Sequence, residues 1–170
     1  MNEHQRYGEV EVKRLGRNGY LHRIIPIVDS AGNVVERLVR PLMVEFHGKD
    51  VLQTVIGSAL LAIPVSYTEE AWNLGAELPN ASVAGIALLS LLFIGTFVYF
   101  NFYKGYMRGF VLQFVLRVAA TYLVSLTVVA TILTIILLAP WDSDLALAIK
   151  RTVIVAFPAS MAATVADALK

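Results

Sequence analysis

Residues 83–103 read VAGIALLSLLFIGTFVYFNFY, an uncharged and largely apolar run. A helix rises about 1.5 Å per residue, so a run of this length crosses the roughly 30 Å hydrocarbon core of a bilayer. Aromatic residues gather at the carboxyl-terminal end of the run, where the aromatic belt of a membrane interface belongs. This stretch therefore predicts a transmembrane helix and, with it, an integral membrane protein.

Three other stretches are long and apolar enough to be membrane spans. They cover residues 51–67, with an optional extension to 74, then 112–139 and 152–169. Charged residues make up 16% of the chain and the mean hydropathy is +0.66, whereas about 25% of a soluble domain is charged. The sequence predicts an all-α membrane protein, built as a bundle of about four transmembrane helices.

The polar amino-terminal part contains a predicted β-hairpin. Two β-branched runs, 23–28 and 34–39, are joined by residues 29–33, which are rich in Asp, Gly and Asn. This combination is typical of a hairpin, and Pro26 predicts that the first strand is an edge strand. A lone hairpin is marginally stable in water. We expect it to pair with a tail strand near 10–12, with a neighbouring subunit, or with the membrane face.

The basic residues predict the orientation of the chain. Eight of the 14 Lys and Arg precede residue 50, and Lys104 and Arg108 follow the second span. Positive charge favours the cytoplasmic side, so we predict a multi-pass protein of the inner (plasma) membrane with both termini cytoplasmic. Residues 1–48 are interpreted as a cytoplasmic tail and hairpin, and residues 49–170 as the transmembrane helical domain.

A few basic residues lie inside the apolar stretches. The third span is too long for a perpendicular crossing, so either it tilts, or its first turns around Arg117 lie at the interface with the guanidinium directed outward to the headgroups. Lys150 and Arg151 interrupt the last apolar stretch, which is why that span is predicted to begin at 152. This places the two cations near the outer face, against the orientation rule. They are expected to pair with Asp142 or Asp144, or to lie in a short surface helix.

Acidic residues supply the candidate cation-attracting sites. Glu69 and Glu70 follow the first span and precede Trp72, and Glu77 lies in the same connection. Carboxylates at a membrane edge are costly unless they are solvated, paired or bound to a cation, and a ring of them concentrates cations at a pore mouth. The alternative is an ordinary solvated acidic connection. Asp167, near the carboxyl terminus, is expected to be solvated.

Hydroxyl and small side chains form stripes on the last two spans. Thr121 and Ser125 either line a hydrated path, as pore candidates, or make hydrogen bonds within and between helices. The last span has Ala156, Ser160 and Thr164 at four-residue spacing. Small residues at this spacing allow helices to approach closely, so these three predict a packing interface within or between subunits.

Several classes of function lack support in the sequence. The chain contains no cysteine, and its three histidines show no paired spacing with another ligand, so any metal site is unknown. We find no nucleophile elbow, phosphate loop or dinucleotide fingerprint, and predict neither catalysis nor a cofactor. The amino-terminal basic residues are interleaved with acidic ones, which argues against nucleic-acid binding.

One stretch resembles a known family. Residues 41–79 read PLMVEFHGKDVLQTVIGSALLAIPVSYTEEAWNLGAELP, with Val-Glu-Phe-His at 44–47, Ala-Ile-Pro-Val at 62–65 and Thr-Glu-Glu at 68–70. This stretch resembles an uncharacterised family of prokaryotic integral membrane proteins, known as a domain of unknown function. The resemblance implies a small multi-helix membrane protein and carries no activity with it.

Together these features predict a small homo-oligomeric cation channel or transporter. A bundle of about four short helices has little room for an internal path, and a symmetry axis makes one more easily. Acidic residues at the outer mouth suit inorganic cations as the transported species. The alternative is a non-conducting structural or accessory membrane protein that packs against a partner. The partners predicted are the lipid bilayer, further copies of the chain and cations.

Overall fold

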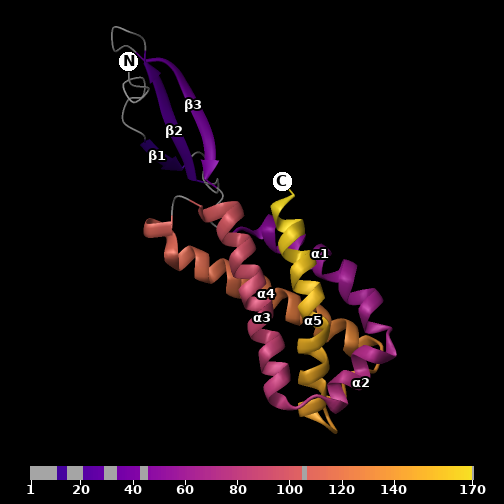
Figure 1. The fold of residues 1–170 in the computed structure, drawn as a ribbon. Coiled ribbons are helices and arrows are strands. Elements are labelled where there is room, and N and C mark those ends of the chain that lie inside the picture. Colours follow the sequence, from indigo (N-terminus) through magenta and orange to yellow (C-terminus); the bar gives the residue numbers. More distant parts are fainter. Residues whose placement is uncertain (1–10, 15–20, 29–33, 43–45, 105–106, 170) are drawn as a thin grey trace. The chain divides into compact units, whose positions relative to one another are not determined.

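The computed structural model describes the chain except for residues 1–10, 15–20, 29–33, 43–45, 105–106 and 170. The chain forms two compact units, Met1–Glu45 and Phe46–Lys170. The first consists of strands and the second of helices (Figure 1).

The amino-terminal unit contains a three-stranded antiparallel sheet in the order β1-β2-β3. The strands are β1 (Glu11–Arg14), β2 (Leu21–Val28) and β3 (Val34–Leu42). The predicted hairpin is β2 and β3, and its predicted turn at 29–33 lies outside the described residues. The tail strand pairs with the hairpin, as one of the three alternatives expected.

The expectation that β2 is an edge strand is wrong, because β2 is the central strand of the sheet. The position of Pro26 explains why a proline is tolerated there. The described pairing of β1 with β2 ends at Glu11 opposite Ile24, and Pro26 lies two residues beyond, opposite Arg37 of β3. A missing N–H at that position removes no described β1–β2 pair.

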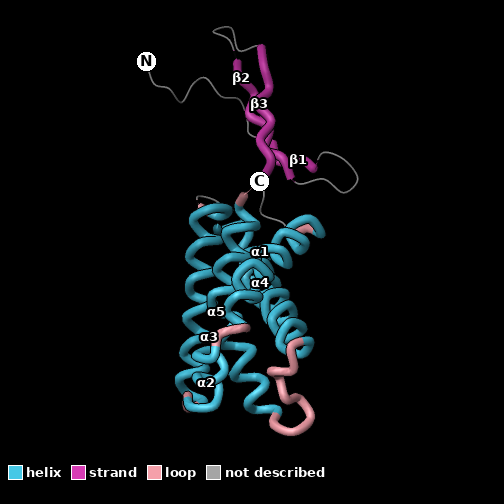
Figure 2. The backbone as a smooth tube through the Cα atoms, turned by 90° about the vertical axis from the view of Figure 1, so that its right-hand side faces the viewer, coloured by secondary structure: helices cyan, strands magenta, loops and turns pink. Residues whose placement is uncertain are grey.

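The helical unit contains four helices that are long and apolar enough to cross a membrane: Gly48–Ser66, Asn80–Tyr103, Gly109–Ile135 and Leu145–Ala168. The fold class predicted from the sequence is confirmed. These spans correspond to helices α1 (Gly48–Ser66), α3 (Asn80–Val98) continued by the π-helix η2 (Tyr99–Tyr103), α4 (Met107–Ile135) and α5 (Leu145–Ala168), with a short α2 (Glu69–Glu77) after α1. In Figures 1 and 2, α3 and α5 run side by side, and α4 crosses the bundle obliquely.

The first span ends earlier than its optional extension to residue 74. Pro64 lies in the last turn of α1, and the helix ends two residues later at Ser66. Thr68, in extended conformation, then precedes α2 as its N-cap residue. The indole of Trp72 donates to the Ser66 carbonyl at 2.8 Å, so α2 folds back onto the end of α1 as a separate helix.

The last span begins at Leu145 instead of residue 152. The carboxylate of Asp144 accepts from the Leu147 N–H at 2.9 Å and caps the helix. Lys150 and Arg151 lie inside α5 and donate to main-chain carbonyls, at Leu78 and Leu138 respectively, each at 2.8 Å. The expectation that a surface helix or the nearby aspartates would accommodate them is therefore wrong. Both side chains thus donate to carbonyl groups that follow the ends of α2 and α4, where no further helical turn supplies a hydrogen-bond donor.

The third span has a kink at its start and a turn at its end. Phe110 has φ −133° and ψ 26°, which interrupts α4 after its first residues. The helix ends at Ile135, four residues before the predicted end, and Leu137 follows with φ 60°. The Leu138 N–H donates back to the Leu133 carbonyl at 2.8 Å, the closing bond of a left-handed helix cap.

Small residues make up much of the core, and large aliphatic residues cover the outside. The apolar core cluster comprises Ala62, Ala71, Val129, Leu133, Ala139, Ala148, Val155, Ala156 and Ala159. A Cβ atom added at Gly57 of α1 would lie 2.8 Å from Cα of Ala163 in α5, so these helices are in backbone contact. Leu88 and Leu112 are 68% and 67% exposed. Close packing through small residues with leucines outside is typical of helices in lipid.

Candidate functional site

A buried arginine lies between two buried aspartates in the helical unit. Arg117 of α4 has an exposed fraction of 0%, as does Asp50 of α1, and Asp167 of α5 is 1% exposed. Both Nε and Nη2 of Arg117 donate to Oδ2 of Asp167, at 3.1 and 2.6 Å. The same Nη2 lies 3.7 Å from Oδ2 of Asp50. We call these three residues the Arg117 cluster.

The two aspartates show that the ends of α1 and α5 meet at this cluster. Asp50 lies in the first turn of α1, and its Oδ2 accepts from the His47 main-chain N–H at 2.9 Å. Asp167 lies in the last turn of α5. Arg117, about ten residues into α4, therefore ties together three helices at one end of the unit.

Aromatic rings enclose the guanidinium. The guanidinium carbon of Arg117 lies 3.9 Å from the centroid of the Phe102 ring and 5.6 Å from that of Phe46. The hydroxyl of Tyr103, which is fully buried, accepts a hydrogen bond from Arg117. Phe102 and Tyr103 belong to η2, where one wider helical turn changes the direction in which side chains point. Such π-helical turns occur frequently at functional sites.

A seam of buried polar side chains continues from the cluster into the bundle at steps of three or four residues. In α1 Asp50 is followed by Thr54 and Ser58, in α4 Arg117 is followed by Thr121 and Ser125, and in α5 Asp167 is preceded by Thr164 and Ser160. Each of these side chains is at most 2% exposed. We call this set the polar seam. It gives three helices a polar face that is directed inward, away from lipid.

The polar seam ends at the apolar core, about halfway along the spans. The next positions at the same spacing are Ala62 in α1, Val129 in α4 and Ala156 in α5, all of them in the core cluster. The Ser58 hydroxyl donates to the Ser125 hydroxyl at 2.9 Å, and this bond links α1 to α4 at the deepest point of the seam. The seam is therefore interrupted by the apolar core cluster, and the buried hydroxyls of Ser66 and Thr152 lie beyond it.

The pore candidates on the third span lie inside this seam. Ser125 donates to the Thr121 carbonyl at 2.8 Å, and both residues face the interior of the unit. Thr121 Oγ1 is buried with no hydrogen-bond partner among the described residues. The predicted helix-packing residues Ala156, Ser160 and Thr164 are likewise buried within the chain's own helical unit.

The three candidate glutamates lie elsewhere. Glu69, Glu70 and Glu77 are exposed on α2, whose buried face consists of Ala71 and Gly75. Because α2 follows the far end of α1, a helix of about 27 Å, the glutamates and the Arg117 cluster lie at opposite ends of the unit. In the part of the chain that the structure describes, no three His, Asp or Glu residues form a metal-binding group.

Arg117 and Asp167 lie in surroundings that differ from those expected from the sequence, and Asp50 was not among the predicted site residues. Arg117 does not direct its guanidinium to the headgroups, and Asp167 is buried instead of solvated. Both expectations were wrong because they treated each charged side chain by itself, and an isolated charge near a helix end is expected to be solvated by water. The four-residue spacing of Asp50, Thr54 and Ser58 was the available signal, since it marks one polar face on an apolar helix.

Four long apolar helices with leucines on their outer surface define an integral membrane protein with four candidate spans. Residues 32–168 match the family described as "Putative integral membrane protein (DUF2391)". The chain belongs to this family, and the resemblance stated from residues 41–79 is confirmed. Comparison with curated proteins and with solved structures gave no match.

Proposed function

We propose that this protein transports a proton or a small monovalent cation across the membrane, and that the ion binds at the Arg117 cluster. The observation that carries the proposal is the burial of one guanidinium and two carboxylates inside a membrane-spanning bundle. Ionisable groups in such positions are expensive, and they mark ion pathways and proton relays. An arginine used only for packing is more cheaply replaced by an apolar side chain.

The geometry supports a competition between an ion and Arg117. Asp167 holds Arg117 through two donors, whereas Asp50 lies 3.7 Å from it. We take Asp50, which heads the polar seam in α1, as the carboxylate that binds the incoming cation. While an ion or proton is bound to Asp50, Arg117 stays paired with Asp167. When the ion or proton is released, the guanidinium can approach Asp50. The Asp50 carboxylate accepts from the His47 main-chain N–H and lies beside the Arg117 guanidinium.

The polar seam supplies the path on one side of the membrane. Its hydroxyls give oxygen ligands or proton carriers for about two helical turns beyond Asp50. The apolar core closes the path, so we propose alternating access instead of a continuously open pore. At the other end, the exposed Glu69, Glu70 and Glu77 attract cations to the mouth through their negative charge.

A flux assay with reconstituted liposomes tests this proposal. A trapped pH dye reports protons, and separate vesicles report Na⁺ and K⁺. We expect Asp50→Asn to remove flux, because an amide has no negative charge for the ion. We expect Glu70→Gln to retain most of it at physiological salt, because exposed charges act weakly there. Elution volume and circular dichroism establish that both variants remain folded.

Two results would contradict the proposal. The first is wild-type flux no greater than that of empty vesicles for all three cations. The second is full flux in Asp50→Asn. If instead Glu69→Gln or Glu70→Gln removes flux while Asp50→Asn retains it, the ion passes along a shared axis of a homo-oligomer, which is the pore expected from the sequence. The mass of the detergent-solubilised protein then has to exceed that of a monomer.

The structure of α5 does not support the alternative of a non-conducting accessory protein that packs against a partner through the small residues of the last span. The small residues Ala156, Ser160 and Thr164 are buried by helices of the same chain, so they offer no face to an external partner. A purely structural role also leaves the polar seam without a purpose, since hydroxyls in lipid-embedded interfaces contribute about 0.6 kcal/mol per hydrogen bond on average. Transport is therefore the better-supported function.

A further inference from the structure

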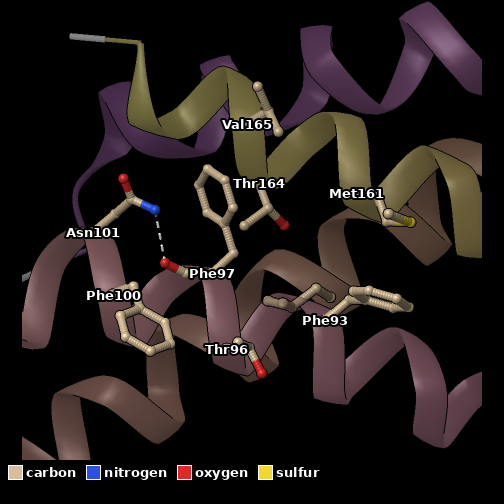
Figure 3. A pocket seen from close by; sticks show the side chains of 9 residues that line it. Phe93, Thr96, Phe97, Phe100, Asn101, Met161, Thr164 and Val165 are labelled. Carbon is tan, nitrogen blue, oxygen red and sulfur yellow. Dashed lines mark hydrogen bonds between the residues drawn. The ribbon is translucent and has the colours of Figure 1, made fainter.

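A groove lies between α3–η2 and α5 on the outside of the helical unit. Its volume is about 270 Å³, and Figure 3 shows the rings of Phe93, Phe97 and Phe100 facing it, with Met161 and Val165 on the other side. The amide of Asn101 donates to the Phe97 carbonyl at 2.9 Å. The Thr164 hydroxyl donates to the Ser160 carbonyl at 2.6 Å. Since these polar donors are satisfied by their own helices, the groove presents an apolar wall.

The side chain of Lys104 provides a positive charge at one end of this groove. Lys104 directly follows the second span, which ends at Tyr103, and its side chain is exposed. Its ammonium nitrogen lies 5.9 Å from the centroid of the Phe100 ring, which lines the groove. The apolar wall therefore leads to a positive charge at the membrane interface.

The length of the groove matches one leaflet. Phe93 and Tyr103 are ten residues apart on the second span, which is a rise of about 15 Å, and Lys104 follows directly. One leaflet contributes about 15 Å of the hydrocarbon core. An acyl chain that enters beside Lys104 thus reaches Phe93 near the midplane.

We propose that this groove binds an anionic phospholipid, with an acyl chain along the three phenylalanines and the phosphate on Lys104. Basic residues at the interfacial end of a gap between transmembrane helices recognise anionic headgroups. The occupied segment of α5 ends at Val165, two residues before Asp167. A bound lipid therefore fixes the part of α5 that carries a carboxylate of the Arg117 cluster. The inference is independent of transport.

Native mass spectrometry of the full chain in detergent tests the inference, with added phosphatidylglycerol or phosphatidylcholine of identical acyl chains. We expect the wild type to retain phosphatidylglycerol in preference. Lys104→Gln lowers that preference about fivefold, which corresponds to roughly 1 kcal/mol per basic residue near a membrane surface. The control Lys49→Gln, an exposed lysine at the same end of the unit, leaves it unchanged.

A second pair of variants tests the groove itself. Val165→Trp fills it and lowers retention of both lipids, whereas Val115→Trp, on the exposed surface of α4, does not. Equal losses in Lys104→Gln and Lys49→Gln would overturn the inference, because they would indicate a general surface charge. Unchanged retention in Val165→Trp would also overturn it. So would a wild-type dimer without bound lipid that becomes monomeric in Val165→Trp, because a second copy would then be the occupant.

Discussion

Replacing Arg117 by Met removes the guanidinium that lies between Asp50 and Asp167. Removing one partner of a buried ion pair destabilises a protein by about 3–5 kcal/mol, because the other charge stays buried without it. Asp167→Asn is expected to cost less, about 1–2 kcal/mol, since Arg117 still has Asp50. At their separation of 3.7 Å, an effective dielectric constant near 20 gives an attraction of about 4 kcal/mol.

Thermal unfolding in detergent micelles measures both variants. A change of 1 kcal/mol shifts the melting temperature by about 2–4 °C for a chain of this length, so we expect a loss of about 10 °C in Arg117→Met and about 4 °C in Asp167→Asn. The control is Thr131→Val, whose exposed hydroxyl bonds only its own helix. If Arg117→Met melts at the same temperature as the control, or if Asp167→Asn is less stable than Arg117→Met, the shared-arginine account is wrong.

Three further predictions concern packing and orientation. Gly57→Ala places a methyl group 2.6 Å from Cβ of another helix and is expected to lower stability by about 1–3 kcal/mol. Gly85→Ala, with open space around it, is expected to raise stability by up to about 1 kcal/mol. Unfolding in detergent measures both variants, and equal shifts would contradict the close contact of α1 with α5. Leu137→Gly relieves φ 60° and is expected to raise stability by about 0.5–1 kcal/mol in the same assay. In this cysteine-free chain, an impermeant maleimide is expected to label Glu77→Cys in intact cells and Lys49→Cys only after permeabilisation; the reverse pattern would invert the predicted orientation.

Hydropathy predicted the four spans because lipid imposes a length and a composition on each crossing helix independently of its neighbours. Helix ends were harder to predict. The end of α1 near Pro64 follows from local chemistry, and its exact position depends on Trp72 folding back onto Ser66. The start of α5 was misplaced because Lys150 and Arg151 were expected to exclude that segment from a span. Their carbonyl partners lie in other parts of the chain, which local sequence does not specify.

The candidate site was harder still to predict. Arg117 and Asp167 are fifty residues apart in the chain, and only the packing of α4 against α5 makes them a pair. Their burial is likewise a property of the assembled bundle. A periodicity search for polar residues within apolar helices would have found the Thr and Ser positions and the charged residue that heads each series. It would not have indicated which helices face each other.

The backbone contact at Gly57 also restricts how this molecule can change shape. At Gly57 no side chain separates α1 from α5, so the two backbones are in direct contact and one helix cannot easily slide past the other. We therefore expect α1 and α5 to move together as one rigid unit. The backbone of α4 departs from helical geometry at Phe110, and we expect motion in the remaining helices and about this kink. We therefore expect α4 to rotate about Phe110 relative to α1 and α5, so that Arg117 moves from Asp167 toward Asp50.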